Sequence, residues 1–243
     1  MPLRMAARSS ERGKRLKGRF SCCGCSQATK PFAFLFARIM YTIYMHGCLQ
    51  PIQRHTKRES RMIDPDECLI VHYCHPYCSP LQNIVRLPKE EAFALARSLA
   101  AANPETTAFY RFADFENYYD LRMRQDQWLY DTFVALGGKP KERHPLSFVF
   151  QGSAYLADWF GNGEITTIPL REIPADCVSF TWGDSGARYN RGESMTLYTK
   201  EAFSEVLRAY HGSLDAFLEE VALTHRYIEV QVWDDAFCTR PCS

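Results

Sequence analysis

RYIEVQVW, residues 226–233, is the stretch that decides the fold class. Ile228, Val230 and Val232 alternate with polar residues, which is the two-residue period of a β-strand. Such a strand turns its apolar residues to a core and turns the alternate residues to its other face. Glu229 and Gln231 must therefore face either solvent or a cleft.

The elements upstream of this strand do not follow a strict β-α-β alternation. Apolar or alternating runs predict further strands at 68–74, 146–150, 164–170, 177–182 and 194–199. Helical patterns cover 89–103, 115–136 after Asp114 as a predicted N-cap, a short run at 154–160, and two helices that begin after Thr199 and Ser213. About six strands with four or five helices in this order predict a single α+β domain with a mixed or mostly antiparallel sheet.

The segment GDSGARYNRGES, residues 183–194, is rich in glycine and follows a predicted strand. It predicts a loop, most simply a hairpin connection with Asp184 and its neighbours in turn positions. It matches neither phosphate-loop motif, and the sequence leaves the cofactor unknown. Loops with such side chains also form sites, which makes Asp184, Ser185 and Arg188 candidate ligand-binding residues.

Charged and aromatic residues are dense from 111 to 119, where the long helix begins. An aromatic ring beside an arginine can bind a planar ligand, which makes Arg111 and Tyr118 candidate ligand-binding residues. The same residues would also suit a helix that docks on the sheet edge, with its rings in the core.

The charge is divided unevenly along the chain. Residues 1–62 hold thirteen Lys and Arg against two Glu, a net charge of about +11, and the remainder has a net charge of about −10. We therefore divide the chain into a basic head, 1–62, and a single domain, 63–243. The acidic domain is not expected to bind nucleic acid, whereas the head could bind nucleic acid or an anionic membrane.

Three interpretations of the head stay open. Its apolar run at 31–45 is too short to span a bilayer and contains Arg38, so no transmembrane segment is predicted. The head could be a disordered extension, a targeting segment, or upstream sequence read from a start codon assigned ahead of Met62.

The ten cysteines are poorly arranged for a disulfide framework, which favours reduced thiols and a cytoplasmic location. Cys68, His72, Cys74, His75 and Cys78 are residue types that bind zinc, but no second pair of ligands follows in the domain. We therefore predict no metal ligand, and a zinc-stabilised binding domain stays an alternative. Cys74 with His72 or His144 could form a nucleophile and base, although no spacing selects such a pair.

The runs HPLSFVFQGSAYLADWF at 144–160, VSFTWGDS at 178–185 and YIEVQVWDD at 227–235 resemble a group of uncharacterised bacterial proteins of unassigned function. The resemblance covers nearly everything after Met62. It implies one folded unit and a bacterial source, and it brings no activity with it.

A second resemblance, to the ADP-ribosyltransferase fold, depends on LIVHYC and YIEVQ. Such enzymes place His or Arg on a first core strand against the NAD ribose, aromatic residues around the nicotinamide, and Glu on a late strand. The resemblance implies catalytic roles for His72 and Glu229. The sequence departs from that family in having no S-T-S-like stretch and no recognisable active-site loop ahead of Glu229.

These observations favour a small enzyme or ligand-binding domain for a nucleotide-like or other polar small molecule. A non-catalytic interaction module is the other alternative, and it would expose an aromatic patch and lack a deep polar pocket. The sequence does not predict the oligomeric state.

Overall fold

A computed structural model describes residues 62–238 of the chain. The expectations for the basic head, other than at Met62, lie outside this range. Among the described residues, no helix combines the length and apolar character needed to cross a bilayer.

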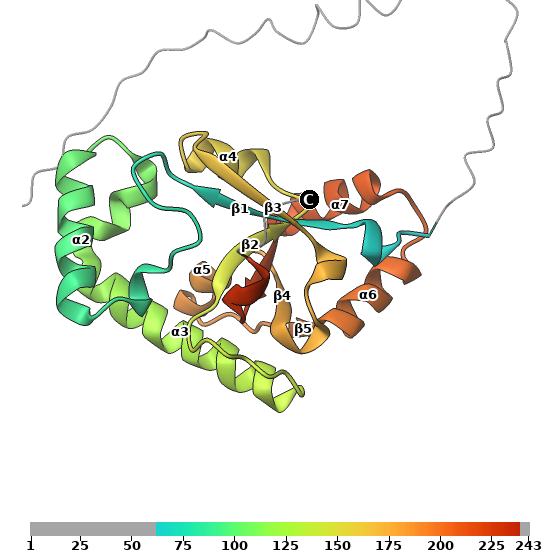
Figure 1. The fold of residues 1–243 in the computed structure, drawn as a ribbon. Coiled ribbons are helices and arrows are strands. Elements are labelled where there is room, and N and C mark those ends of the chain that lie inside the picture. The colour runs from blue at the N-terminus through green and yellow to red at the C-terminus, as the bar shows by residue number, and fades with distance from the viewer. Residues whose placement is uncertain (1–61, 239–243) are drawn as a thin grey trace, which may run out of the picture. The chain divides into compact units, whose positions relative to one another are not determined.

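Six strands form one sheet at the centre of the described unit (Figure 1). They are β1 (Leu69–Cys74), β2 (Leu146–Phe150), β3 (Glu164–Pro169), β4 (Val178–Trp182), β5 (Leu197–Thr199) and β6 (Ile228–Val232). Their order across the sheet is β3-β1-β2-β6-β4-β5, and every pair of neighbouring strands is antiparallel. The α+β class and the antiparallel sheet predicted from the sequence are confirmed.

Helices flank this sheet and connect its strands. The α-helices are α2 (Lys89–Ala102), α3 (Phe115–Ala135), α4 (Ala154–Trp159), α5 (Ser185–Asn190), α6 (Lys200–Ala209) and α7 (Leu214–His225). The 3₁₀ turns are η1 (Pro65–Glu67), η2 (Ile84–Arg86), η3 (Thr107–Asp114), η4 (Leu170–Glu172), η5 (Ala175–Cys177) and η6 (Asp235–Phe237). Thr199 and Ser213 cap α6 and α7 as predicted, because each side-chain oxygen accepts a hydrogen bond from a backbone N–H of the first turn.

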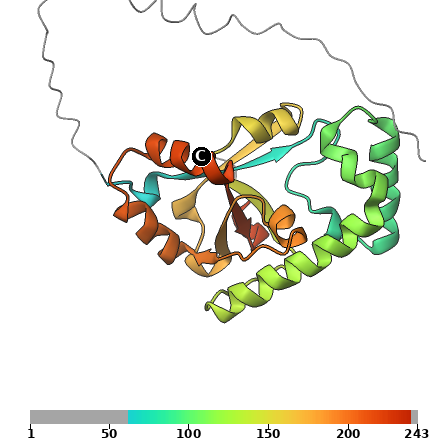
Figure 2. The ribbon, with the colours of Figure 1, turned by 180° about the vertical axis from the view of Figure 1, so that it is seen from behind.

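One face of the sheet forms the main core. Ile228, Val230 and Val232 of β6 lie on this face, as the alternating pattern predicts, and all three are buried. Helices α6 and α7 cover it, and they lie together on the side of the sheet away from α2 (Figures 1 and 2). Phe203 of α6 stacks on Phe180 with ring centroids 4.2 Å apart.

The opposite face is partly covered by α3. Trp233, just after β6, is fully buried and stacks on Phe133 of α3 at 5.5 Å. Polar residues on this face are paired with one another, since Gln231 donates to the Thr181 hydroxyl and accepts from the Ser179 hydroxyl. These bonds satisfy buried polar groups that would otherwise destabilise the sheet.

A helical unit of α2, η3 and the start of α3 lies beside the sheet (Figure 1). Its own small core holds Ala92, Ala96 and Phe115, and Phe115 makes ring contacts with Phe93 and Phe112. The prediction of a core role for the aromatic cluster therefore holds for Phe115.

Two sequence predictions about local structure hold only in part. Strands β4 and β5 pair as antiparallel neighbours, as the predicted hairpin connection requires, but residues 185–190 between them form helix α5 and not a loop, which brings the described α-helices to six. The carboxylate of Asp184 caps this helix by accepting a hydrogen bond from the Ala187 N–H at 2.8 Å. Asp114 precedes α3 but makes no capping bond, because its carboxylate accepts from the Asn117 amide instead.

We expect Phe203→Ala to lower the free energy of unfolding by about 3–5 kcal/mol, because it empties a packed site between Phe180 and Phe150. Denaturant unfolding would measure the change. Leu223→Ala on α7 is the control: this side chain is 85% exposed, so its removal should change stability by less than about 0.5 kcal/mol. Equal effects of the two substitutions would contradict the assignment of the core face.

Candidate functional site

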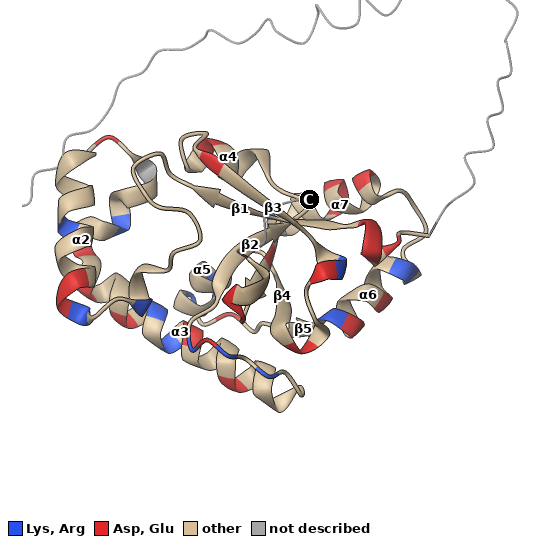
Figure 3. Ribbon diagram, in the orientation of Figure 1, with Lys and Arg blue, Asp and Glu red and all other residues tan. Residues whose placement is uncertain are grey.

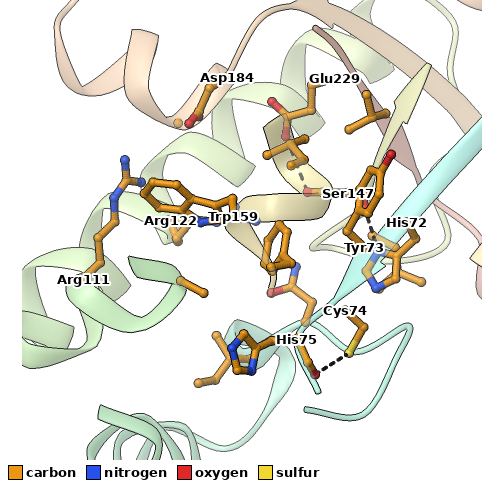
Figure 4. Close-up of a pocket in the computed structure, with 18 of the residues that line it drawn as sticks. His72, Tyr73, Cys74, His75, Arg111, Arg122, Ser147, Trp159, Asp184 and Glu229 are labelled. Carbon is orange, nitrogen blue, oxygen red and sulfur yellow. Dashed lines mark hydrogen bonds between the residues drawn. The ribbon is translucent and has the colours of Figure 1, made fainter. Parts of the chain in front are cut away.

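A cavity of about 1210 Å³ opens where β1 and β2 separate. The two strands pair through only two residue pairs, Ile70 with Phe150 and Val71 with Val149, although both strands continue beyond them. The cavity walls come from both strands, from β6, and from η3, α3, α4 and the start of α5 (Figure 4).

Glu229 supplies a carboxylate to this cavity from the middle of the sheet. The β6 residue pairs with Val149 of β2 and Thr181 of β4, so it shares the face opposite the main core with them. Its side chain accepts a 2.8 Å hydrogen bond from the Ser185 N–H and a longer one, 3.4 Å, from the Ser147 hydroxyl. The position of this carboxylate is therefore set by three separate segments of the chain.

The environment of Glu229 changes its protonation. Burial, and then the nearby Asp184 carboxylate, raise the pKa of Glu229 to about 7, against the pull of Ser185 and Arg122 in the other direction. A carboxyl group with a pKa near neutral pH can exchange a proton with a reacting group. Perturbed acids of this kind in a cavity are candidates for catalysis.

Behind Glu229, a cluster of polar side chains from α3 is buried against α5 and β2. Asp126 is fully buried and lies 3.3 Å from the Arg122 guanidinium and 2.9 Å from His144 Nδ1. Gln125 donates to the Ser185 hydroxyl at 2.7 Å. Arg122 Nε and Gln125 Oε1 are buried without a hydrogen-bond partner in the described residues, and both residues line the cavity.

The structure brings most of the predicted site residues together. Six of the seven line the cavity: His72, Arg111, Tyr118, Asp184, Arg188 and Glu229. Ser185 is the exception, since it is fully buried behind the wall and contacts Glu229 through its backbone N–H.

His72 has both ring nitrogens engaged by the main chain. Its Nε2 accepts from the Leu81 N–H at 3.2 Å, so its Nδ1 is the nitrogen that donates to the Ser147 carbonyl at 2.9 Å. Its ring packs on Phe148, on the core side of the sheet. Burial lowers the pKa of His72, which favours this neutral form. The catalytic role of His72 stays a prediction, and its geometry suits a residue that holds β1, β2 and the loop at 81 in place.

A row of aromatic rings with an arginine at each end crosses the cavity wall. Trp159 contacts Tyr110 at 5.9 Å and Tyr155 at 6.0 Å. The Arg111 guanidinium lies over the Tyr110 ring and that of Arg226 lies over Tyr155, at 5.4 and 4.9 Å. Neither arginine forms an ion pair within residues 62–238, so both cations are available to an anionic ligand.

Arg188 is engaged within its own loop. Its guanidinium pairs with Glu193 at 3.0 Å and donates to the carbonyls of Trp182 and Ser194. These contacts hold α5 against the end of β4. To contact a ligand as predicted, the Arg188 guanidinium would have to break one of these three interactions.

The cysteines of the described chain do not support the zinc or thiol alternatives. Between residues 62 and 238, no three His, Cys, Asp or Glu side chains are grouped so that they could hold a metal ion. The Cys74 thiol donates to the Cys78 carbonyl at 3.4 Å, and burial raises the pKa of Cys74 to about 11. A thiol with this pKa is a poor nucleophile at neutral pH.

Sequence reasoning missed several residues of the site, above all Arg122, Ser147, Trp159 and Tyr227, which all line the cavity. One signal was available for α3: Gln125 and Asp126 share its buried stripe with Leu129 and Phe133, and a polar pair in such a stripe indicates a buried network. No comparable signal marks Ser147, because its partners His72 and Glu229 are distant in the sequence.

Comparisons of the chain with protein-family models, with curated proteins and with solved structures found no match. The two resemblances noted in the sequence therefore stay predictions.

The raised pKa of Glu229 predicts a pH-dependent stability. Between the ordinary carboxyl value near 4.5 and about 7, the folded state binds more protons than the unfolded state, so stability falls as pH rises. Glu229→Gln keeps an acceptor for Ser185 and has no charge to bury. We expect the free energy of unfolding of Glu229→Gln, relative to that of the natural protein, to increase by roughly 2–3 kcal/mol from acid to neutral pH.

Denaturant unfolding at several pH values would measure this gain. The exposed Glu205→Gln variant removes the same charge from α6 and controls for net charge. A constant difference between Glu229→Gln and the natural protein across the pH range would contradict the raised pKa.

Proposed function

We propose that residues 62–238 form an enzyme domain that binds a nucleotide-like ligand and transfers its glycosyl group, in the manner of an ADP-ribosyltransferase. One observation carries the proposal: the buried Glu229 carboxylate faces the same cavity as Arg111, Arg226 and a row of aromatic rings. The proposed substrate is NAD or a related dinucleotide.

The charge of the cavity supports an anionic ligand. Six arginines and no lysine line it, against four carboxylates, whereas the sequence after Met62 has a net charge of about −10. Arginine forms paired hydrogen bonds with phosphate oxygens, and within residues 62–238 neither Arg111 nor Arg226 has a carboxylate partner to give up. Figure 4 shows Arg111, Trp159 and Glu229 among the residues around the cavity.

The size and the rings of the cavity support a ligand with planar groups. A volume of about 1210 Å³ exceeds the range of roughly 300–1,000 Å³ common for small-molecule sites, so a dinucleotide has room. Trp159, Tyr110 and Tyr155 offer faces on which an aromatic base can stack. A non-catalytic interaction module would lack a deep polar pocket, so the presence of this cavity argues against that alternative.

The proposed chemistry follows from the position of Glu229. The bond between the anomeric carbon of the ribose and the nicotinamide nitrogen breaks, and nicotinamide leaves with the electron pair. The ionised carboxylate stabilises the oxocarbenium-like transition state. An acceptor oxygen or nitrogen then forms the new bond to the anomeric carbon and gives its proton to Glu229.

The resemblance to uncharacterised bacterial proteins adds a bacterial source to this proposal. The arrangement of the cysteines in the sequence adds a cytoplasmic location.

Ligand binding is tested first, because it does not depend on catalysis. We expect NAD to raise the thermal unfolding temperature of the full chain. Arg111→Ala should weaken NAD binding by roughly tenfold or more, because it removes a cation from the cavity. Arg97→Ala, an exposed arginine of α2 away from the cavity, is the matched control. No stabilisation by NAD or any other nucleotide would refute the proposal.

Catalysis is tested by release of nicotinamide from NAD, measured by chromatography with water or added protein as acceptor. Because the reaction needs the ionised carboxylate, the rate should rise between about pH 6 and pH 8, following the raised pKa of Glu229. Glu229→Gln should lower the rate by roughly a hundredfold or more and leave NAD binding largely intact. Binding without any release would leave a ligand-binding domain and remove the enzymatic part of the proposal.

A further inference from the structure

A second, smaller pocket of about 220 Å³ lies on the side of the sheet that α6 and α7 cover. Its walls come from the end of β4, from the turn between α6 and α7, and from α7. The lining residues are Trp182, Tyr210, Phe217, Glu220, Val221, Thr224 and His225. The function proposed above makes no use of this pocket.

Three aromatic residues, which we call the cage, line this pocket. Phe217 of α7 is buried and forms the back wall. Tyr210 meets it at 5.2 Å with the ring planes 70° apart, and Trp182 meets it at 6.0 Å and 61°. Both rings therefore meet Phe217 in edge-to-face contacts, and all three residues line the same pocket.

The Tyr210 wall is held in position before any ligand binds. Its hydroxyl donates to the Glu220 carboxylate at 3.2 Å. Its ring also lies where Gly212 has no side chain, since a Cβ at Gly212 would come within 2.6 Å of the Tyr210 ring. The backbone of Gly212 does not adopt the left-handed conformation that favours glycine. The lack of a side chain at this position therefore leaves room for the Tyr210 ring.

The charges at this pocket favour a cation. Glu220 stands at the edge of the cage, and α7 carries Asp215, Glu219 and Glu220 but no lysine or arginine (Figure 3). Burial, and next the neighbouring Arg188, lower the pKa of His225, which keeps this wall neutral near pH 7. The faces of the three rings add negative quadrupole potential to that of the carboxylate.

We propose that Trp182, Tyr210, Phe217 and Glu220 bind a methylated ammonium group, as found in choline-type compounds or methylated lysine. Aromatic walls attract such a cation and match its apolar methyl groups, and a small pocket selects the head group over a larger ligand. Glu220 adds charge complementarity that a neutral ligand of the same shape would not use.

The proposal is tested by titrating the full chain with choline and with its neutral carbon isostere, in which a tert-butyl group replaces trimethylammonium. Calorimetry and tryptophan fluorescence give the affinities. We expect choline to bind about fivefold or more tightly than the isostere, because only the cation gains from the rings and from Glu220. Equal affinity for the two compounds, or no binding of either, would overturn the proposal.

Two variants locate the binding. Glu220→Gln should weaken choline about threefold or more and leave the isostere unchanged, whereas Asp215→Asn removes the same charge elsewhere on α7 and should change neither. Gly212→Ala should displace the Tyr210 ring and weaken both compounds. If Gly212→Ala lowers stability too far, the Glu220 and Asp215 pair decides alone, and equal effects of these two substitutions would reject the cage.

Discussion

The alternation of side chains along β6 is the constraint on which both the fold and the candidate site depend. This strand lies between β2 and β4, so both of its edges are paired, and all five of its residues are buried. Ile228, Val230 and Val232 join the main core, and the same backbone must then turn Glu229 and Gln231 to the other face. Gln231 finds hydroxyl partners there, and Glu229 is directed into the cavity. A shift of one residue in register would exchange the two sets and destroy both.

The cluster around Glu229 is better explained by a binding or catalytic role than by stability. Moving charged groups out of water costs several kcal/mol each, and a buried ion pair recovers this only when its remaining hydrogen bonds are satisfied. Here Arg122 Nε and Gln125 Oε1 have no partner in the described residues. An apolar arrangement of the same volume would be at least as stable. The unsatisfied donor and acceptor are themselves buried, and they belong to two residues that line the cavity.

The sequence predicted the elements with strong periodicity and the face of β6 on which Glu229 lies. The regular strand and helix patterns of β6, α2 and α7 led to the correct elements, and the alternation along β6 turned Glu229 away from the core, whereas its catalytic role came only from a resemblance and stays a prediction. Helix α5 was missed because Gly183, Asp184 and Gly186 favour a turn locally. Gly186 also makes a close tertiary approach, since a Cβ there would come within 2.9 Å of Gln125 Oε1 on α3. Arg122 was missed although its ion-pair partner Asp126 is only four residues away, because Glu229 and Asp184, which place it at the site, are distant in the sequence.

The turn between α7 and β6 connects the two pockets at a strained residue. Arg226 has φ of 66° and ψ of −41°, and the Tyr227 N–H closes a tight turn on the His225 carbonyl at 2.8 Å. A non-glycine residue in this region costs roughly 1–3 kcal/mol, and such strain persists only where surrounding contacts maintain it. Here the Arg226 guanidinium is held over Tyr155, and the backbone of Tyr227 bonds to Gly183 at the end of β4. His225 lines both pockets, so this turn fixes the cage on one side and the approach to Glu229 on the other.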